Sequence, residues 1–379
     1  MKKTWVVAAA ACAVVVVLLA YYIFSGLAQV PPSFEEDDLN VPVIDDLSHD
    51  AEYPGPISGM SYPWEFSASI SRSMTIYADF GGVMELFLQN EGSNDLYVHH
   101  YRVGWEDGNS TYQVNCSRLV PSGHETGLGV LYFAGPGEAG PATLEISMEM
   151  WASSANGAFW DDLGEMDIDT LDLVAVQELP LRDREVQSNP VDYYNKVNQL
   201  IDLEAVDSFA DQVLVEAPGD YGLLQILKAY ELVSSEIEYV VDADDHWQSP
   251  SETISLGTGD CEDHSLLLTS LITALGGTCR VNLISGHAFP TVYVGNATVI
   301  DEVVEAVQAY YGNPMPIYYT VDDLGYWLVV DTNGMPYAGG CPAAATPIGP
   351  SGGTSWNFDS GDWIMLIDVT GETVDQGLF

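Results

Sequence analysis

The hydrophobic pattern of the chain changes near residue 180, and this change limits what its two halves can fold into. From residue 61 to about 178, short runs such as "VMELFLQN" and "LYVHHYRVGW" alternate or are rich in β-branched and aromatic residues. Glycine-rich turn signals such as "GPGEAG" separate the runs. Regular short strands between such turns are typical of a β-sandwich, so we expect an all-β, immunoglobulin-like domain over residues 61–180.

The second half has a different period. Apolar residues recur at helical spacing between 190 and 240, as in "YGLLQILKAYELVSSEI". Strand-like runs such as "RVNLISG" and "AFPTVYVG" follow the helical stretch. Helices followed by strands predict an α+β domain over residues 190–370. The 379 residues are enough for two or three domains with sizeable cores.

The N-terminus contains twenty consecutive apolar residues, 5–24, after Lys2 and Lys3. This length spans a bilayer as a helix, and the lysines place residues 1–4 in the cytoplasm. We therefore expect a single-pass cell-membrane protein with an extracytoplasmic body. The alternative is secretion after cleavage of a signal peptide near Gly26 and Ala28. Residues 25–60 are acidic and rich in proline, so we expect a solvated linker that buries nothing.

The charge of the chain restricts its partners. It has 56 acidic and 10 basic residues, and after Lys228 the only basic residue is Arg280. Such a surface repels nucleic acid, because nothing neutralises the phosphates. An apolar fraction of 47% excludes a disordered chain. The acidity is explained either by solvation in a salty medium or by attraction of a lysine-rich protein or peptide.

The cysteines and histidines predict no metal site and no cofactor. Cys12 lies in the apolar N-terminal segment, and spacing alone leaves open whether Cys279 pairs with Cys341. His99 and His100 lie in one predicted strand without a third ligand at useful spacing. We expect these two histidines to serve packing or to lie on the surface.

One cysteine lies in a distinctive context, "GTGDCEDHSLLL". Asp260 is a good N-cap, which makes Cys261 the first residue of a helix whose leucines predict burial. The helix dipole should lower the pKa of a thiol at that position. Glu262 and Asp263 act in the opposite direction, so a reactive thiolate needs a positively charged partner. A structural cysteine is the competing interpretation.

Among the histidines, His287 is the best candidate for that partner, because it opens a predicted strand beside the helix. His264 lies on the same helix and should point away from the cysteine, and His246 lies in a polar loop. A carboxylate on a neighbouring strand should orient the imidazole. Asp331 ends "YWLVVD" and fits this role, with Asp301 as the alternative.

Residues 220–345, about a third of the chain, resemble the transglutaminase-like superfamily, in particular its archaeal and bacterial cysteine proteases. The matching features are Trp247, Pro250, Glu252 and Thr253, then "GDCED", the Ala-Leu-Gly helix end, "GHA" and "YWLVVD". The resemblance implies a papain-like α+β core with a catalytic triad of Cys261, His287 and Asp331.

The resemblance also implies a chemistry. Cys261 would be the nucleophile, His287 the general base and then acid, and Asp331 the residue that orients the imidazole. The Cys261 main-chain N–H would stabilise the oxyanion, with a second donor from Trp247 or Gln248. Some bacterial relatives require calcium, but spacing assigns no ligand set here. Residues 301–325 depart from the family pattern as an insertion, which is why Asp301 stays an alternative to Asp331.

We therefore expect a membrane-anchored thiol enzyme that acts on peptide or protein amides through a thioester, with hydrolysis favoured over crosslinking. The alternative is a non-catalytic cell-surface protein that uses the transglutaminase-like domain for binding or as a scaffold. A complete Cys-His-Asp set favours the enzyme.

Overall fold

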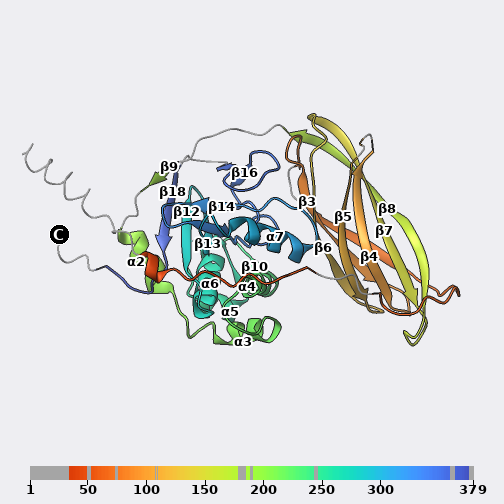
Figure 1. Ribbon diagram of the computed structural model, residues 1–379, viewed down its shortest axis with the longest axis horizontal. Coiled ribbons are helices and arrows are strands. Elements are labelled where there is room, and N and C mark those ends of the chain that lie inside the picture. The colour runs from red at the N-terminus through yellow and green to blue at the C-terminus, as the bar shows by residue number, and fades with distance from the viewer. Residues whose placement is uncertain are drawn as a thin grey trace, which may run out of the picture.

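The computed structural model describes residues 34–48, 53–72, 76–106, 108, 110–177, 185–187, 191–242, 246–358 and 363–374. Figure 1 shows a β-rich half beside a half in which helices pack on a sheet. Each half has its own cluster of buried apolar residues.

Two sheets form the β-rich half. One has the strand order β1-β3-β6 and the other β2-β8-β7-β4-β5. All neighbours are antiparallel except β2 and β8. Alternating side chains from both sheets, including Leu86, Tyr101 and Met148, fill one core. The strands are β1 (Phe66–Arg72), β2 (Ile76–Tyr77), β3 (Gly82–Asn90), β4 (Leu96–Trp105), β5 (Thr111–Val120), β6 (Glu125–Phe133), β7 (Gly140–Ser153) and β8 (Trp160–Gln177).

The other half is built on a six-stranded sheet with the order β14-β15-β13-β12-β18-β9. Its strands are β9 (Glu185–Gln187), β12 (Cys279–Ile284), β13 (His287–Gly295), β14 (Tyr319–Val321), β15 (Tyr326–Val329) and β18 (Trp363–Asp368). Two short pairs accompany the sheet: β10 (Glu238–Tyr239) with β11 (Thr258–Gly259), and β16 (Ala345–Pro347) with β17 (Trp356–Phe358). The helices are η1 (Glu36–Asp38), α2 (Val191–Leu200), α3 (Asp207–Glu216), α4 (Leu223–Glu236), α5 (Pro250–Leu256), α6 (Cys261–Ala274) and α7 (Ile300–Tyr311).

Helix α6 is the central element of this half. It contacts β12 and β13 on one side and α3, α4 and α5 on the others. Apolar residues occur all around it, and Leu266, Leu267, Leu268 and Leu271 are completely buried. A helix that is apolar on every face must be covered on every face, which explains why the other helices surround it.

The two halves pack against each other. Asn313, just after α7, donates from Nδ2 to the Val130 carbonyl over 2.7 Å and accepts from the Tyr132 N–H over 3.2 Å. Both partners belong to β6, and Tyr132 shares the apolar core of the helical half. The Asn313 side-chain amide thus satisfies main-chain groups on the open edge of β6, from the other half of the molecule.

Residues 34–48, expected to be a solvated stalk, lie instead along the helical half. Val43 exchanges main-chain hydrogen bonds with Tyr221 and Leu223, and Asn40 bonds to Thr278 and Gly276. Leu47 is buried in the core of this half. The prediction that this segment buries nothing is wrong, because Leu47 is buried even though the acids of the segment are exposed.

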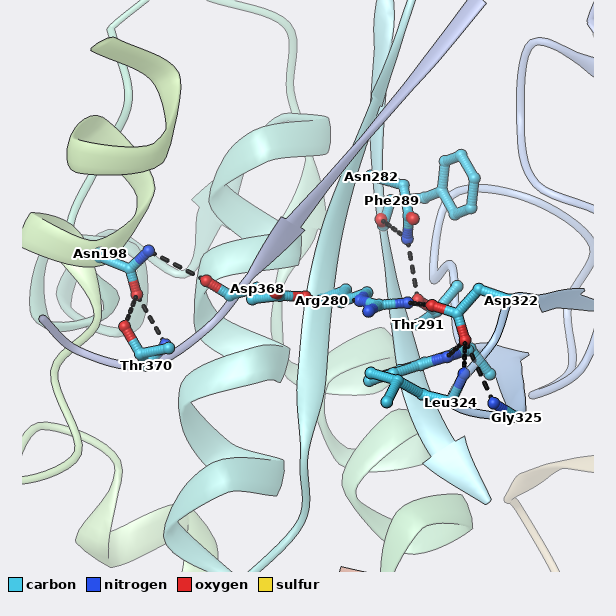
Figure 2. Close-up of polar contacts among 11 residues, drawn as sticks. Asn198, Arg280, Asn282, Phe289, Thr291, Asp322, Leu324, Gly325, Asp368 and Thr370 are labelled. Atoms are coloured by element: carbon cyan, nitrogen blue, oxygen red, sulfur yellow. Dashed lines mark hydrogen bonds and ion pairs between the residues drawn. The ribbon is translucent and has the colours of Figure 1, made fainter. Parts of the chain in front are cut away.

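A buried ionic network ties the sheet to its surroundings (Figure 2). Arg280 on β12 donates from Nε to Asp368 over 2.6 Å, and its Nη1 bonds to Asp322. Its guanidinium lies 3.6 Å above the centre of the Trp327 ring. Burial alone would raise the pKa of Asp322, but Arg280 holds it below its ordinary value. Arg280, the one basic residue after Lys228, therefore has a structural role.

The structure corrects the predicted fold class and localisation. The described chain is mostly β, since strands contain more residues than helices and the longest element is the 18-residue strand β8. None of the helices in the described ranges is long and apolar enough to cross a membrane. The α+β fold class with an N-terminal transmembrane helix, and the single-pass localisation, are contradicted by these findings. Residues 5–24, on which the predicted transmembrane helix and the localisation rested, lie outside the described residues.

The open question about a disulfide also has an answer. Among the described residues, none of the four cysteines (Cys116, Cys261, Cys279 and Cys341) takes part in a disulfide.

Candidate active site

The local sequence fixes Cys261 at the start of α6. Gly257 ends α5 in the left-handed conformation, at φ 66°, which a residue with a side chain rarely adopts. Asp260 then caps α6 in a capping box, in which its N–H donates to Asp263 Oδ2 over 3.1 Å. As the sequence predicts, Cys261 is the first residue of the helix.

The thiol has two close polar neighbours. Its Sγ–H donates to Glu262 Oε2 over 3.1 Å, and the Ala288 main-chain N–H lies near enough to the sulfur to affect the pKa of the thiol. Burial raises the pKa of the Cys261 thiol well above its usual range, and the bond to Glu262 raises it further, while the Ala288 N–H opposes both. The sequence predicted a lowered pKa from the helix dipole. Desolvation and the adjacent carboxylate outweigh the dipole, so the resting thiol is protonated.

His287 directly precedes Ala288 in the chain. It opens β13 directly after the two-residue turn at Ser285 and Gly286, and it is 7% exposed. Its Nε2 lies 2.7 Å from Asp331 Oδ2, and its ring is stacked on Phe289 with 14° between the planes. The imidazole is thus held by one hydrogen bond and one ring contact. Nδ1 is the ring nitrogen that remains available for proton exchange.

Asp331 is itself fixed from two sides. Its Oδ1 accepts the Asn333 N–H over 3.0 Å, and its Oδ2 accepts the Ala343 N–H over 2.8 Å. Both donors belong to the loop that follows β15. A carboxylate held by two main-chain N–H groups is well placed to orient an imidazole.

The other candidate residues lie elsewhere. Asp301 is exposed in the first turn of α7, so the structure pairs His287 with Asp331 and not with Asp301. His264 is engaged by another residue, since its Nδ1 lies 2.9 Å from Thr332 Oγ1. His246 is exposed and lies 4.0 Å from the Glu252 carboxylate.

The acids around Cys261 have unusual titration behaviour. Burial and the neighbouring Asp260 carboxylate raise the pKa of Glu262 to about 7. Burial raises the pKa of Asp263 to about 6, against the effect of the two main-chain N–H groups that it accepts. Asp260 Oδ1 and Glu262 Oε1 are buried without a donor from any other described residue. Near neutral pH, Glu262 is therefore only partly charged, which reduces its repulsion of a thiolate.

The predicted support residues Trp247 and Gln248 occupy the approach to α6. The Gln248 N–H donates to Asp263 Oδ1 over 2.7 Å, so it cannot also donate to an oxyanion. The side-chain Nε2 is therefore the group of Gln248 that could still donate to an oxyanion, while its Oε1 is a buried acceptor without a partner among the described residues. Trp247 is covered by Lys196, whose Nζ lies 3.8 Å from the ring centre.

Sequence reasoning missed four groups of this site: the Glu262 carboxylate as the hydrogen-bond partner of the thiol, and the main-chain N–H groups of Ala288, Asn333 and Ala343. A main-chain donor has no residue signature, so no pattern in the sequence could have found the last three.

Among the described residues, two sets of three side chains have metal-ligating atoms close together. One is Asp260, Cys261 and Glu262 in this site, and the other is His99, His100 and Glu149 in the β-rich half.

Comparisons with known proteins add little to this geometry. The sequence matches no known protein family, and no curated protein matches it. Among solved structures, the "putative ApaA protein" of Bordetella pertussis has a TM-score of 0.22 and 11% identity, over 31% of this chain and 97% of that one. A "putative protease" of Parabacteroides distasonis has a TM-score of 0.23 and 10% identity, over 60% of this chain and 65% of that one. At such TM-scores neither similarity bears on fold or function.

Proposed function

We propose that this protein is a thiol enzyme that cleaves or transfers amide bonds of peptides or proteins, with Cys261 as nucleophile, His287 as general base and acid, and Asp331 as the residue that orients the imidazole. The observation that carries the proposal is the meeting of three distant segments. Helix α6, which begins at Cys261, contacts β13, and the Ala288 N–H of β13 lies near enough to the Cys261 sulfur to lower the pKa of the thiol. The preceding residue, His287, bonds to Asp331 over 2.7 Å. The resemblance of residues 220–345 to the transglutaminase-like superfamily supports the same assignment.

The reaction begins with a proton transfer. In the resting structure the thiol proton is shared with Glu262, so the side chain must turn from Glu262 toward His287 before it can react. His287 then takes the proton at Nδ1, because Nε2 is engaged by Asp331. The imidazolium that forms is stabilised by the Asp331 carboxylate, which the loop after β15 holds in place.

The covalent steps follow from this arrangement. The thiolate attacks the amide carbonyl carbon, the C–N bond breaks, and the leaving amine takes the proton from His287. A thioester to Cys261 remains. Water, deprotonated by His287, attacks the thioester, which releases a carboxylic acid and restores the thiol. If a primary amine attacks in place of water, a new amide forms.

The main-chain N–H of Cys261 at the start of α6 and the Gln248 side-chain amide are the donors proposed for the oxyanion. Hydrolysis is favoured over transfer, as for the simple members of the superfamily outside animals. The excess of acids, 56 against 10 basic residues, favours lysine-bearing substrates, whether these are cleaved or serve as acyl acceptors.

One observation favours a second candidate, a non-catalytic binding or scaffold protein. The pKa of the Cys261 thiol is raised by burial and by Glu262, which is the behaviour of an inert buried cysteine. The two candidates differ in whether His287 changes the reactivity of Cys261.

The test is to incubate the full chain with casein, with and without a fluorescent primary amine. A thiol hydrolase produces new N-termini, and a transferase incorporates the amine into casein. Cys261→Ser and His287→Ala should abolish both products, while Cys116→Ser should abolish neither. If neither product appears with the wild type, or if Cys261→Ser still forms it, the proposed function is wrong.

A further inference from the structure

Two adjacent histidines on β4 point to the same place. Neighbouring residues of a regular strand face opposite sides of the sheet. Between Val98 and His100, however, the register of β4 shifts against both β5 and β7, which marks a β-bulge. The bulge brings the two imidazoles together, with His99 Nδ1 at 3.1 Å from His100 Nδ1.

A carboxylate completes the group. Glu149 on β7 is the register partner of His100, and its Oε2 lies 3.4 Å from His100 Nδ1. The three potential ligand atoms all lie within 4.8 Å of one another. No spacing in the sequence relates residues 99 and 149, because pairing of two strands across an intervening segment creates the contact.

The surroundings hold the two rings in place. His100 is 4% exposed, and His99 is stacked against Tyr53, with ring centres 5.4 Å apart. The Nε2 atoms of both histidines are buried without a hydrogen-bond partner among the described residues. Their Nδ1 atoms therefore carry the polar chemistry of the pair, and both are directed at the same point beside Glu149.

We propose that His99 Nδ1, His100 Nδ1 and Glu149 Oε2 bind a divalent transition-metal ion, with Zn²⁺ as the best fit. Two imidazoles and a carboxylate are ligands that suit zinc. Ligands about 2.05 Å from a tetrahedral zinc are about 3.3 Å apart, which the observed separations of 3.1 and 3.4 Å approach. The side chain of Glu149 is 32% exposed, so the fourth position of the ion opens toward solvent.

The ion would join β4 to β7 within the five-stranded sheet. This site lies in the β-rich half, on elements that contribute nothing to the Cys261 site, so it does not depend on the proposed function. The strongly acidic chain raises the local concentration of any cation, but it does not distinguish zinc from calcium. The two imidazoles favour zinc over calcium, because calcium prefers oxygen ligands.

The experiment is calorimetric titration of the chelator-treated full chain with Zn²⁺ in excess calcium chloride, which occupies unspecific acidic sites. We expect one equivalent of zinc to bind, and Co²⁺ to give the visible absorption of a tetrahedral nitrogen-ligated ion. Glu149→Gln and His99→Ala should each weaken zinc binding at least about tenfold. The matched control is Glu145→Gln, which removes an exposed carboxylate from the same strand, and His124→Ala removes an exposed histidine.

The proposal is overturned if the wild type binds no zinc under these conditions, or if Glu149→Gln binds zinc as tightly as Glu145→Gln does. Folding is checked by the thermal midpoint without metal, which should agree among wild type, Glu149→Gln and Glu145→Gln. Added zinc should raise the midpoint of the wild type and of Glu145→Gln more than that of Glu149→Gln. An equal rise in all three would also contradict the proposal.

Discussion

The β12–β13 hairpin carries a buried polar cluster at each end, and the two clusters are satisfied to different degrees. At the open end, Arg280 bonds to Asp368 and Asp322, and Asp322 also accepts from Leu324, Gly325 and Trp327 (Figure 2). At the turn end, near Cys261 and His287, buried oxygens of Asp260, Glu262 and Gln248 have no donor among the described residues.

This difference separates a structural cluster from a candidate functional one. Burying a polar atom without a partner costs free energy, so such atoms beside a thiol and an imidazole are candidates for use by a substrate or a reaction step. The charged groups of the Arg280 cluster are paired with one another. The Cys261 cluster combines acceptors without a donor, the thiol at the start of α6, and the oriented imidazole of His287. His287 lies at the turn of the β12–β13 hairpin.

The largest effect is expected from breaking the satisfied cluster. Arg280→Met leaves the buried Asp368 and the half-buried Asp322 without their cation, which should lower the free energy of unfolding by about 3–5 kcal/mol. The measurement is urea denaturation. Arg102→Met is the matched control, because Arg102 and Glu165 form a half-exposed ion pair whose loss should cost less than about 1 kcal/mol. Equal losses in the two variants would contradict the structural role assigned to Arg280.

The second prediction concerns the oriented imidazole. Asp331→Asn keeps the shape of the site but removes the charge that stabilises the His287 imidazolium. Amide turnover should fall by about 10²–10⁴-fold. The unfolding midpoint should also fall, because the buried amide nitrogen faces one of the main-chain N–H groups that the carboxylate accepts. The control is Asp301→Asn, which removes an exposed carboxylate that the sequence alone could not separate from Asp331. A loss with Asp301→Asn as large as that with Asp331→Asn would show that the pairing in the structure is not the catalytic one.

The third prediction uses the raised pKa of Glu262. The folded state holds its proton up to pH about 7, whereas the unfolded chain releases it near 4.5, so the folded state binds more protons between these values. The free energy of unfolding therefore falls as pH rises through this window, by at most about 3 kcal/mol from this group.

Glu262→Gln should remove that part of the pH dependence and make the variant more stable than the wild type at pH 8. The measurement is urea denaturation at pH 5 and at pH 8. Glu302→Gln, in the exposed first turn of α7, serves as the control and should leave the difference between the two pH values unchanged. If Glu262→Gln keeps the full pH dependence, the carboxyl does not titrate in this window.

The sequence predicts those parts of the molecule that depend on local pattern. Asp260, the leucines after it and the glycine pair at 276–277 specify where α6 begins and ends, and the structure agrees. The sequence pattern predicts where the strands of this half begin and end. This limited the candidates for proton transfer to His287, paired with either Asp331 or Asp301. The local pattern left both aspartates open, and only the resemblance to the transglutaminase-like superfamily favoured Asp331. In the structure, β15 lies beside β13 and His287 bonds to Asp331.

Other features depend on contacts that no local pattern records. The docking of residues 34–48 depends on a few apolar side chains, such as Leu47, within an acidic segment whose composition indicates solvation. The raised pKa of the Cys261 thiol depends on how deeply α6 is buried. The meeting of His99 and His100 with Glu149 depends on a bulge and on a strand pairing fifty residues apart in the chain.

The central claim is that His287 activates a thiol that the resting structure keeps protonated, and the alkylation rate of Cys261 tests it most directly. The full chain is treated with iodoacetamide from pH 6 to pH 9, and each cysteine is quantified by peptide mass spectrometry. Cys116 is the internal reference, because burial raises its pKa to about 12 and no imidazole activates it in the proposed mechanism. We predict that Cys261 reacts at least about tenfold faster than Cys116 at pH 7, and that His287→Ala removes this difference. Equal rates for the two cysteines in the wild type, unchanged by His287→Ala, would contradict the account.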